Sequence, residues 1–252
     1  MRVFAGPNGS GKSTIIRAVR SYKVKGIPVD FGIYVNADDI ARGLRKGKFS
    51  LRRYRIKFSE SEFINVVSDS GLLNDGFDYN EFMSSFKIED DHIILLKQQA
   101  DERLAQIIAD FLRKKLLLER RKFSFETVFS HQSKLDIMKE AVNAGYKVYL
   151  YFVSTESPEI NKYRVKKVRV EEGGHDVPEE KIVSRYYRSL DFLHEAAQLS
   201  YQTFFFDNSR DGEGFRMFAH FKMVGGVKKW DEIEKSIVPR WFITYYSKKI
   251  FK

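Results

Sequence analysis

The stretch Gly6-Pro-Asn-Gly-Ser-Gly-Lys-Ser13 constrains the fold more than any other part of the sequence. It fits the pattern G-x-x-x-x-G-K-[ST] in full, a pattern that joins a strand to a helix. Residues 2–5 before it are apolar and predict a strand, and residues 14–19 after it show the apolar stripe of a helix. Because the three parts occur in this order, the segment predicts a phosphate-binding loop at the end of the first strand of an α/β sheet.

The residue types of this loop determine what it can bind. Glycines allow successive backbone N–H groups to turn toward phosphate oxygens, and the N-terminus of the following helix adds favourable partial charge. We expect Lys12 to reach the β- and γ-phosphates of ATP and Ser13 to ligate Mg²⁺. The expected nucleotide contacts are Gly6, Pro7, Asn8, Gly9, Ser10, Gly11, Lys12, Ser13 and Thr14.

The same loop also occurs in ABC-type ATPases. Those proteins carry a long apolar strand that ends in Asp-Glu and a helix that begins with a Ser-Gly-Gly signature. Neither pattern occurs in this sequence. The sequence therefore favours phosphoryl transfer to a small molecule over a motor ATPase.

Strands alternate with helices through much of the remaining sequence. We expect strands at 31–35, 123–129, 147–153 and 203–206, and helices at 40–44, 98–120, 133–144 and 157–172. A further helix, capped by Asp176, is expected to extend to residue 197. This alternation is typical of a parallel sheet. The predicted fold is therefore a three-layer α/β fold of the P-loop NTPase, kinase-like type, with a parallel five-stranded sheet flanked by helices.

Two segments depart from this alternation. Residues 46–95 are polar with scattered aromatic residues, and we expect them to form an inserted helical subdomain or lid. Residues 210–252 are basic and aromatic, with strands expected near 215–223 and 241–246. The predicted organisation is a P-loop kinase domain over 1–209, interrupted by the insertion, and a short β-rich C-terminal extension packed on the same domain.

Charge and composition limit the partners and the compartment. The formal net charge of +10 favours partners that carry phosphate, although such a surplus also serves solubility alone. The absence of cysteine excludes a disulfide scaffold and a thiolate metal site, and it fits a reducing cytosol. No apolar run approaches the roughly 18–20 residues of a membrane span, and the N-terminus lacks a signal-peptide pattern. We therefore expect a cytoplasmic protein with no membrane partner.

Ligands of doubly wound sheets gather at the carboxyl ends of the strands, where four side chains are candidates. Asp38 follows the second strand and is the candidate for the carboxylate that takes the proton of an acceptor hydroxyl, with a helix N-cap as its alternative role. Glu126 and Thr127 lie toward the end of the third strand as substrate contacts. Glu126 would orient the acceptor or touch Mg²⁺ through water, or else make a buried structural hydrogen bond. Asn208 follows the last strand and is a candidate nucleotide contact.

Phosphoryl transfer also needs cations that neutralise developing charge. Arg164 and Arg169 lie five residues apart on one expected helix, so their side chains differ in direction by about 140°. At most one of them therefore lines the site. Arg185 or Arg188 on the next expected helix would supply a second cation, and the alternative for each arginine is a solvated surface position.

Several motifs together make the chain similar to the zeta-toxin family. In order, they are GPNGSGKST, VNAD, FSFET, SPE followed by RV..VRV, EEGGHDVPEEKI followed by RYYRSL, and FDNS. The resemblance covers about 1–45 and 121–209, and it is to the branch often labelled predicted ABC-type ATPases. It implies a P-loop kinase fold that uses ATP and Mg²⁺. The best-understood members phosphorylate UDP-N-acetylglucosamine at the 3′-hydroxyl of the sugar, and a small antitoxin protein restrains them.

The resemblance also implies roles for individual residues. Asp38 matches the catalytic base of the family, and Glu126 matches an acidic residue at the substrate pocket. Arg169 matches an ATP-contacting arginine, and Arg164 and Arg185 are further matches. The long insertion and the basic tail depart from the family pattern, so the kinase activity transfers better than the substrate.

Two other functions stay open at this point. One is a kinase that acts on another nucleotide or on a nucleic-acid end, because basic and aromatic residues interleave in 210–252 as they do on strand-binding surfaces. The other is a nucleotide-binding ATPase or regulatory module that transfers no phosphate. UDP-N-acetylglucosamine is the preferred acceptor, and an antitoxin protein is the expected protein partner.

Overall fold

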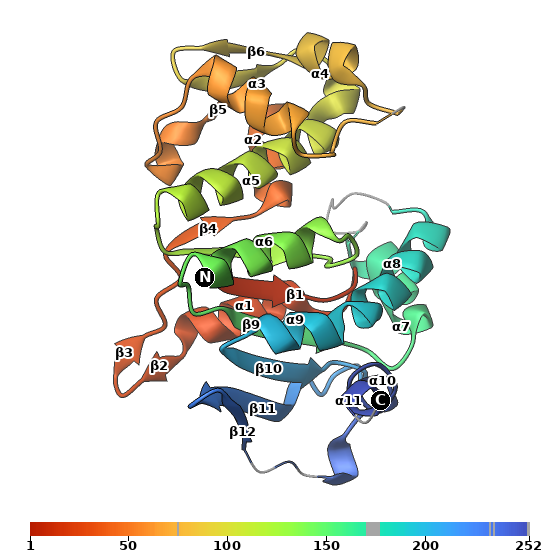
Figure 1. Ribbon diagram of the computed structural model, residues 1–252. Coiled ribbons are helices and arrows are strands. Elements are labelled where there is room, and N and C mark those ends of the chain that lie inside the picture. Colours follow the sequence, from red (N-terminus) through yellow and green to blue (C-terminus); the bar gives the residue numbers. More distant parts are fainter. Residues whose placement is uncertain (75, 170–176, 232, 234, 251–252) are drawn as a thin grey trace. The chain divides into compact units, whose positions relative to one another are not determined.

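The computed structural model describes residues 1–74, 76–169, 177–231, 233 and 235–250 (Figure 1). The chain forms two compact units, one of Met1–Phe31 with Ser124–Lys252 and the other of Gly32–Phe123. The second unit begins before residue 46 and ends after residue 95, so it is longer than the expected insertion. The segment 210–252 belongs to the first unit.

A seven-stranded sheet carries the phosphate loop, with the strand order β12-β11-β10-β9-β1-β8-β4. Its strands are β1 (Arg2–Ala5), β4 (Ile33–Val35), β8 (Phe123–Thr127), β9 (Tyr149–Ser154), β10 (Gln202–Asp207), β11 (Arg216–Val224) and β12 (Val227–Trp230). Strands β8, β1, β9 and β10 are parallel, whereas β11 is antiparallel to β10 and β12 to β11. The prediction of five strands was wrong in number, because the strands of the C-terminal segment continue the main sheet.

Helices follow the strands of the first unit as the sequence predicted. They are α1 (Lys12–Ser21), α6 (Ser133–Asn143), α7 (Pro158–Arg164), α8 (Glu179–Asp191) and α9 (Leu193–Leu199), with a π-helical turn, Val165–Arg169, after α7. Pro158 occupies the first turn of α7, where its missing N–H is not needed. Gly145 follows α6 with φ +82°, the left-handed conformation that commonly ends a helix. Figure 1 shows α6 and α9 side by side over the sheet.

The C-terminal segment is partly helical where a strand was expected. The range 241–246 lies in α10 (Arg240–Phe242) and a π-helical turn (Ile243–Ser247), which α11 (Lys248–Ile250) follows. Trp241, Phe242 and Tyr246 are buried, whereas the two residues after Phe242 are exposed. This spacing follows the helical period and not the alternation of a strand. The aromatic residues of this segment therefore pack into the first unit.

The second unit is a mixed α/β structure, so the prediction of a helical subdomain was wrong in part. Its helices are α2 (Ala37–Arg45), α3 (Glu60–Ser68), α4 (Tyr79–Ser85) and α5 (Asp101–Leu118), and its strands β5 (Lys48–Ser50), β6 (Phe86–Glu89) and β7 (His92–Leu95) form an antiparallel sheet in the order β5-β7-β6. The scattered aromatic residues form its core: the Phe63 ring lies 5.1 Å from Phe111, and Phe82 lies 4.9 Å from Phe86.

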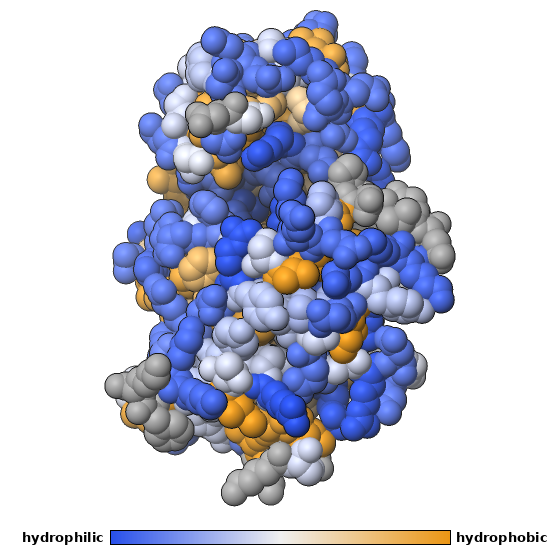
Figure 2. Space-filling model, turned by 90° about the vertical axis from the view of Figure 1, so that its right-hand side faces the viewer, coloured by the Kyte–Doolittle hydropathy of each residue, from blue (hydrophilic) through white to orange (hydrophobic). Residues whose placement is uncertain are grey.

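The remaining elements are short. They are a hairpin of β2 (Lys23–Val24) and β3 (Ile27–Pro28) and 3₁₀ turns at Leu51–Tyr54, Gln98–Ala100 and Lys235–Ile237. Most residues on the face drawn in Figure 2 are hydrophilic, as expected for a chain with 31% charged residues. Within the described part of the chain, every helix is too short or too polar to cross a bilayer.

Candidate functional site

The phosphate loop connects β1 to α1, as predicted. Gly6, Gly9 and Gly11 have φ angles of +148°, +73° and +96°, a region that residues with a side chain rarely adopt. A Cβ atom at Gly6 would lie 2.0 Å from the carbonyl oxygen of Val153, on β9. The backbone of the loop therefore requires glycine at these three positions.

Lys12 is buried at the start of α1, with 8% of its surface exposed. Its ammonium group donates hydrogen bonds to the carbonyl oxygens of Gly6, at 3.0 Å, and Pro7, at 2.9 Å. The same nitrogen lies 4.0 Å from the carboxylate of Glu126, on the neighbouring strand β8. The side chain of Lys12 thus folds back over the loop and lies near Glu126, the acidic residue that the sequence predicted at the site.

Two buried polar atoms of the loop, Asn8 Oδ1 and Ser10 Oγ, have no hydrogen-bond partner among the described residues. Asn8 is 5% exposed and Ser10 is fully buried. Buried polar groups are nearly always hydrogen-bonded. Of these two atoms, the Ser10 hydroxyl can donate to a phosphate oxygen, whereas Asn8 Oδ1 only accepts. A hydroxyl donor, a cation and a glycine-rich backbone fit a polyphosphate such as that of ATP.

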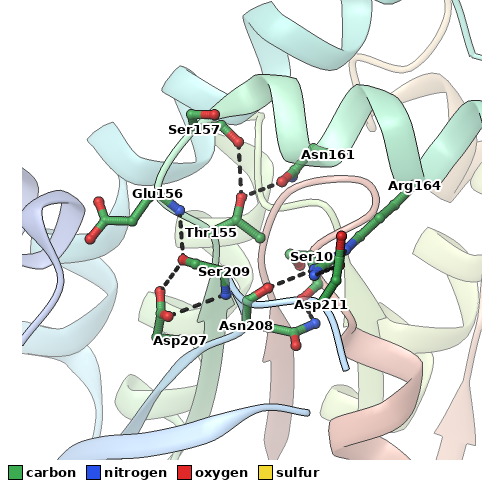
Figure 3. Close-up of polar contacts among 10 residues, drawn as sticks. All are labelled: Ser10, Thr155, Glu156, Ser157, Asn161, Arg164, Asp207, Asn208, Ser209 and Asp211. Atoms are coloured by element: carbon green, nitrogen blue, oxygen red, sulfur yellow. Dashed lines mark hydrogen bonds and ion pairs between the residues drawn. The ribbon is translucent and has the colours of Figure 1, made fainter. Parts of the chain in front are cut away.

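Asn208 contacts the loop, and Arg164 contacts Asn208 (Figure 3). The side-chain amide of Asn208 donates to the carbonyl oxygen of Ser10 at 2.9 Å, and its backbone N–H donates to the Ser154 carbonyl at 2.9 Å. The guanidinium of Arg164 donates to the Asn208 carbonyl at 2.6 Å and to the Asp211 carboxylate at 2.5 Å. Asn208 thus supports the loop from the end of β10, and Arg164, on α7, holds Asn208.

The other predicted arginines lie on the helices that follow. The side chain of Arg169 lies outside the part of the chain that the structure describes. Arg185 is half-buried on α8. Arg188 is exposed on the same helix, and its guanidinium donates to the Ser184 carbonyl at 3.3 Å. The expected difference in direction between Arg164 and Arg169 therefore stays a prediction.

Ser13 and Thr14 are exposed on the first turn of α1, next to the loop. Mg²⁺ bound with a nucleotide usually takes one or two protein oxygens and completes its shell with phosphate oxygens and waters. The hydroxyl of Ser13 fits that requirement. Thr127 has a structural contact instead, because its hydroxyl accepts a hydrogen bond from the N–H of Phe129 at 3.1 Å, where φ is +61°.

Asp38 lies in the second unit, on the first turn of α2. The N-cap of this helix is Asn36, whose side-chain oxygen accepts from the Asp38 N–H at 2.8 Å. The alternative role of Asp38 as the helix cap is therefore wrong. Its neighbour Asp39 pairs with Arg42 at 2.9 Å on the same helix.

A second support of the loop was missed in the sequence. Asn161, on α7, donates from its side chain to the carbonyl oxygen of Asn8 at 2.6 Å. A fully buried asparagine inside a helix is unusual, because asparagine competes for backbone hydrogen bonds and favours helix caps. This preference of asparagine was the signal that could have identified Asn161 in the sequence. It can be used only when the burial of the side chain is known.

Comparison with known proteins gives a relative and a fold. No protein-family model matches the chain. An uncharacterized protein of Haemophilus influenzae is 32% identical over 114 residues, which cover 43% of this chain and 79% of that protein. A chain of the AvrRxo1-ORF1:AvrRxo1-ORF2 complex with sulphate ions superposes with a TM-score of 0.55 and 15% identity, over 93% of this chain and 60% of that one. The complex with ATP gives the same values.

A chain of the PezAT chromosomal toxin–antitoxin system of Streptococcus pneumoniae reaches a TM-score of 0.42 at 14% identity, over 85% of this chain and 71% of that chain. The likeness to the AvrRxo1 complex shows the fold alone, and this chain spans 60% of the length of that structure. The sequence match to the Haemophilus influenzae protein is close enough to show kinship. This chain therefore belongs to the same protein family as that uncharacterized protein.

Proposed function

We propose that this chain is an ATP-dependent phosphotransferase of zeta-toxin type, which transfers the γ-phosphate to a hydroxyl group of a small molecule. The observation that carries the proposal is the loop itself, where buried Lys12 covers glycines of positive φ and the Ser10 hydroxyl lacks a partner among the described residues. The fold likeness to a complex solved with ATP supports ATP as the phosphate donor.

Each residue of the site has a role in the proposed reaction. The loop N–H groups and Lys12 would bind the β- and γ-phosphates, and Ser13 would ligate Mg²⁺, which supplies further neutralisation of charge. Asp38 would accept the proton of the acceptor hydroxyl. Glu126 would orient the acceptor. Arg169 and Arg185 remain the proposed ATP-contacting arginines.

The acceptor and the partner are also proposals. UDP-N-acetylglucosamine is the proposed acceptor because of the resemblance to zeta toxins. The AvrRxo1 chain was solved in a complex of two proteins, which supports a protein partner with an antitoxin role. We infer a cytoplasmic location from the lack of cysteine.

The observation that favoured a nucleic-acid acceptor has a different explanation. Trp241, Phe242 and Tyr246 are 3%, 4% and 0% exposed, so these rings pack in the core and are not available to stack on bases. A small-molecule acceptor is therefore the function we propose.

The test is a search for the phosphorylated product. The protein is incubated with labelled ATP, Mg²⁺ and either a small-metabolite extract or pure UDP-N-acetylglucosamine, and mass spectrometry identifies the molecule that gains one phosphoryl group. We expect one dominant product and slow ATP hydrolysis in its absence, because water is a poor substitute for a positioned hydroxyl. Fast hydrolysis with no phosphorylated product would show an ATPase instead.

Three variants assign the roles. Lys12→Ala should abolish ATP turnover. Asp38→Asn should lower the phosphorylation rate by about 10²-fold or more while ATP binding is kept, since a general base contributes about 10²–10⁴-fold. Asp39→Asn is the matched control, and it should keep the full rate. If Asp38→Asn and Asp39→Asn are equally active, Asp38 is not the base.

A further inference from the structure

Asn161 is held between the phosphate loop and the end of β9. It is fully buried, and its side-chain nitrogen donates to the carbonyl oxygen of Asn8 at 2.6 Å. Its side-chain oxygen accepts from the hydroxyl of Thr155, a contact drawn in Figure 3. A carbonyl needs a donor and a hydroxyl supplies one, so the two neighbours fix the orientation of the amide.

Helix α7 also packs directly on the loop beside this contact. A Cβ atom at Gly9 would lie 2.7 Å from the carbonyl oxygen of Asn161 and 3.1 Å from Cγ2 of Val165. Val165 is fully buried. The corner of the loop at Asn8 and Gly9 therefore has no room to move toward α7.

Behind Asn161, the contacts continue to helix α8. The hydroxyl of Tyr186 donates to the carbonyl oxygen of Thr155 at 2.6 Å, and Tyr186 is 2% exposed. Burial raises the pKa of Tyr186, so the hydroxyl keeps its proton and remains a donor at neutral pH. Tyr186 is adjacent in sequence to Arg185, so the same contact ties the helix of a proposed ATP-contacting arginine to Thr155, the hydrogen-bond partner of Asn161.

The contacts of Asn161 and Asn208 provide hydrogen-bond donors for carbonyl oxygens of the loop. A loop whose N–H groups converge on phosphate turns carbonyl oxygens the other way, and each buried carbonyl needs a donor. Asn161 supplies the donor for Asn8, and Asn208 supplies it for Ser10. Two side-chain amides, one on α7 and one directly after β10, thus hold two carbonyls of the same loop.

We propose that Asn161 is a positioning residue for nucleotide binding, which holds the Asn8 carbonyl so that the loop stays in its phosphate-binding conformation. Thr155 sets the direction of its amide. This inference rests on the proposed function, since it assumes that the loop binds the polyphosphate of a nucleotide.

The test compares Asn161→Ala with Asn143→Ala, an exposed asparagine at the end of α6. Isothermal titration calorimetry measures the dissociation constants of ATP with Mg²⁺ and of inorganic tripolyphosphate. We expect Asn161→Ala to weaken both about tenfold, which corresponds to about 1.4 kcal/mol. The dissociation constants of ATP and of tripolyphosphate should change by the same factor, because the substitution acts on the loop that binds the phosphates of both. Asn143→Ala should bind both as the original protein does.

Thr155→Val removes the hydroxyl and keeps the shape, so it tests the inference without emptying the space that Asn161 fills. It should weaken tripolyphosphate binding severalfold, and it should weaken it by less in an Asn161→Ala background, because both changes remove the contact between Thr155 and Asn161. Thr155→Val also removes the hydrogen bond of the hydroxyl to the Ser157 carbonyl at 3.1 Å. Should Asn161→Ala fail to fold, Thr155→Val carries the test alone. A purely structural role would lower the melting temperature of these variants and leave both dissociation constants unchanged well below it.

The outcomes separate the two proposals. If the original protein binds ATP, Lys12→Ala loses binding, and both Asn161→Ala and Thr155→Val bind normally, the positioning role is wrong and the proposed function stands. If the original protein binds neither ATP nor tripolyphosphate, the proposed function fails, and this inference fails with it.

Discussion

Replacing Gly11 with alanine should destabilise the first unit and disturb the loop at the same time. Gly11 is the residue before α1, with φ +96° and ψ +22°. A residue with a Cβ pays about 1–2 kcal/mol in a left-handed conformation. The Cβ would also lie 2.3 Å from the side-chain nitrogen of Asn208. Asn208 must then leave its hydrogen bond to Ser10, which contributes roughly 0.5–1.5 kcal/mol. The expected loss in free energy of unfolding is about 2–3 kcal/mol.

Gly145→Ala separates the two contributions. Gly145 has φ +82°, but a Cβ there meets no heavy atom within 4 Å, so only backbone strain of about 1–2 kcal/mol applies. Urea unfolding should therefore place Gly11→Ala about 1 kcal/mol below Gly145→Ala, and only Gly11→Ala should lose ATP affinity. In an Asn208→Ala background, which removes the obstructing amide, Gly11→Ala should cost no more than Gly145→Ala. Equal stability of the two single variants, with ATP binding intact in both, would refute the reasoning.

Two further predictions concern stability. Trp241→Phe keeps an aromatic ring but removes the indole N–H that donates to the Asp207 carboxylate at 3.0 Å. Hydrogen bonds to charged groups contribute about 1.5–3 kcal/mol, so urea unfolding should show a loss in that range, and an unchanged midpoint would contradict it. Burial, followed by the charges of Lys228 and Lys249, lowers the pKa of His194 from 6.5. The unfolded chain then takes up the proton more readily, so stability should fall as pH drops below about 6.5. His194→Gln should make the unfolding midpoint less dependent on pH between about 7 and 5, and an identical dependence would exclude His194 as the cause.

Helices and strands whose apolar residues follow one clear pattern could be predicted from the sequence. Strand β9 is a continuous apolar run, and its last five residues are buried in the middle of the sheet. The segment 241–246 is different, because its aromatic and β-branched residues favour a strand by propensity alone. Tertiary contacts hold it in helical form: the Trp241 indole bonds to Asp207, and the Phe242 ring packs edge-on against Phe205, with ring centroids 4.9 Å apart. Such contacts cannot be read from local pattern.

The same limit applies to the second unit. The aromatic residues of the second unit are far apart in the sequence and follow no single period. The sequence of 46–95 was therefore interpreted as a polar segment with scattered aromatic residues. In the structure, Phe63 of α3, Phe86 of β6 and Phe111 of α5 form one cluster, with ring centroids 5.6 Å apart for Phe63 and Phe86 and 5.1 Å apart for Phe63 and Phe111. A core built from several short elements becomes visible only when the elements are placed together.

The loop was predictable because its chemistry lies within eight consecutive residues. Its supports were not, because they come from distant positions: 153 residues separate Asn8 from Asn161, and 198 separate Ser10 from Asn208. The amide of Asn208 bonds to the loop backbone, and its contact with a nucleotide stays a prediction. The motif specifies the strand end but not the direction of its side chains.

The contacts of Arg164 bear on which side chains bring positive charge to the site. Its guanidinium is 15% exposed and is held by the Asp211 carboxylate and the Asn208 carbonyl. An arginine paired in this way brings little net positive charge to a phosphate. Its effect on binding reaches the loop through Asn208, whose amide holds the Ser10 carbonyl. We therefore propose Lys12 as the cation that would neutralise phosphate from within the loop, and Arg164 as a residue that holds Asn208 against that loop.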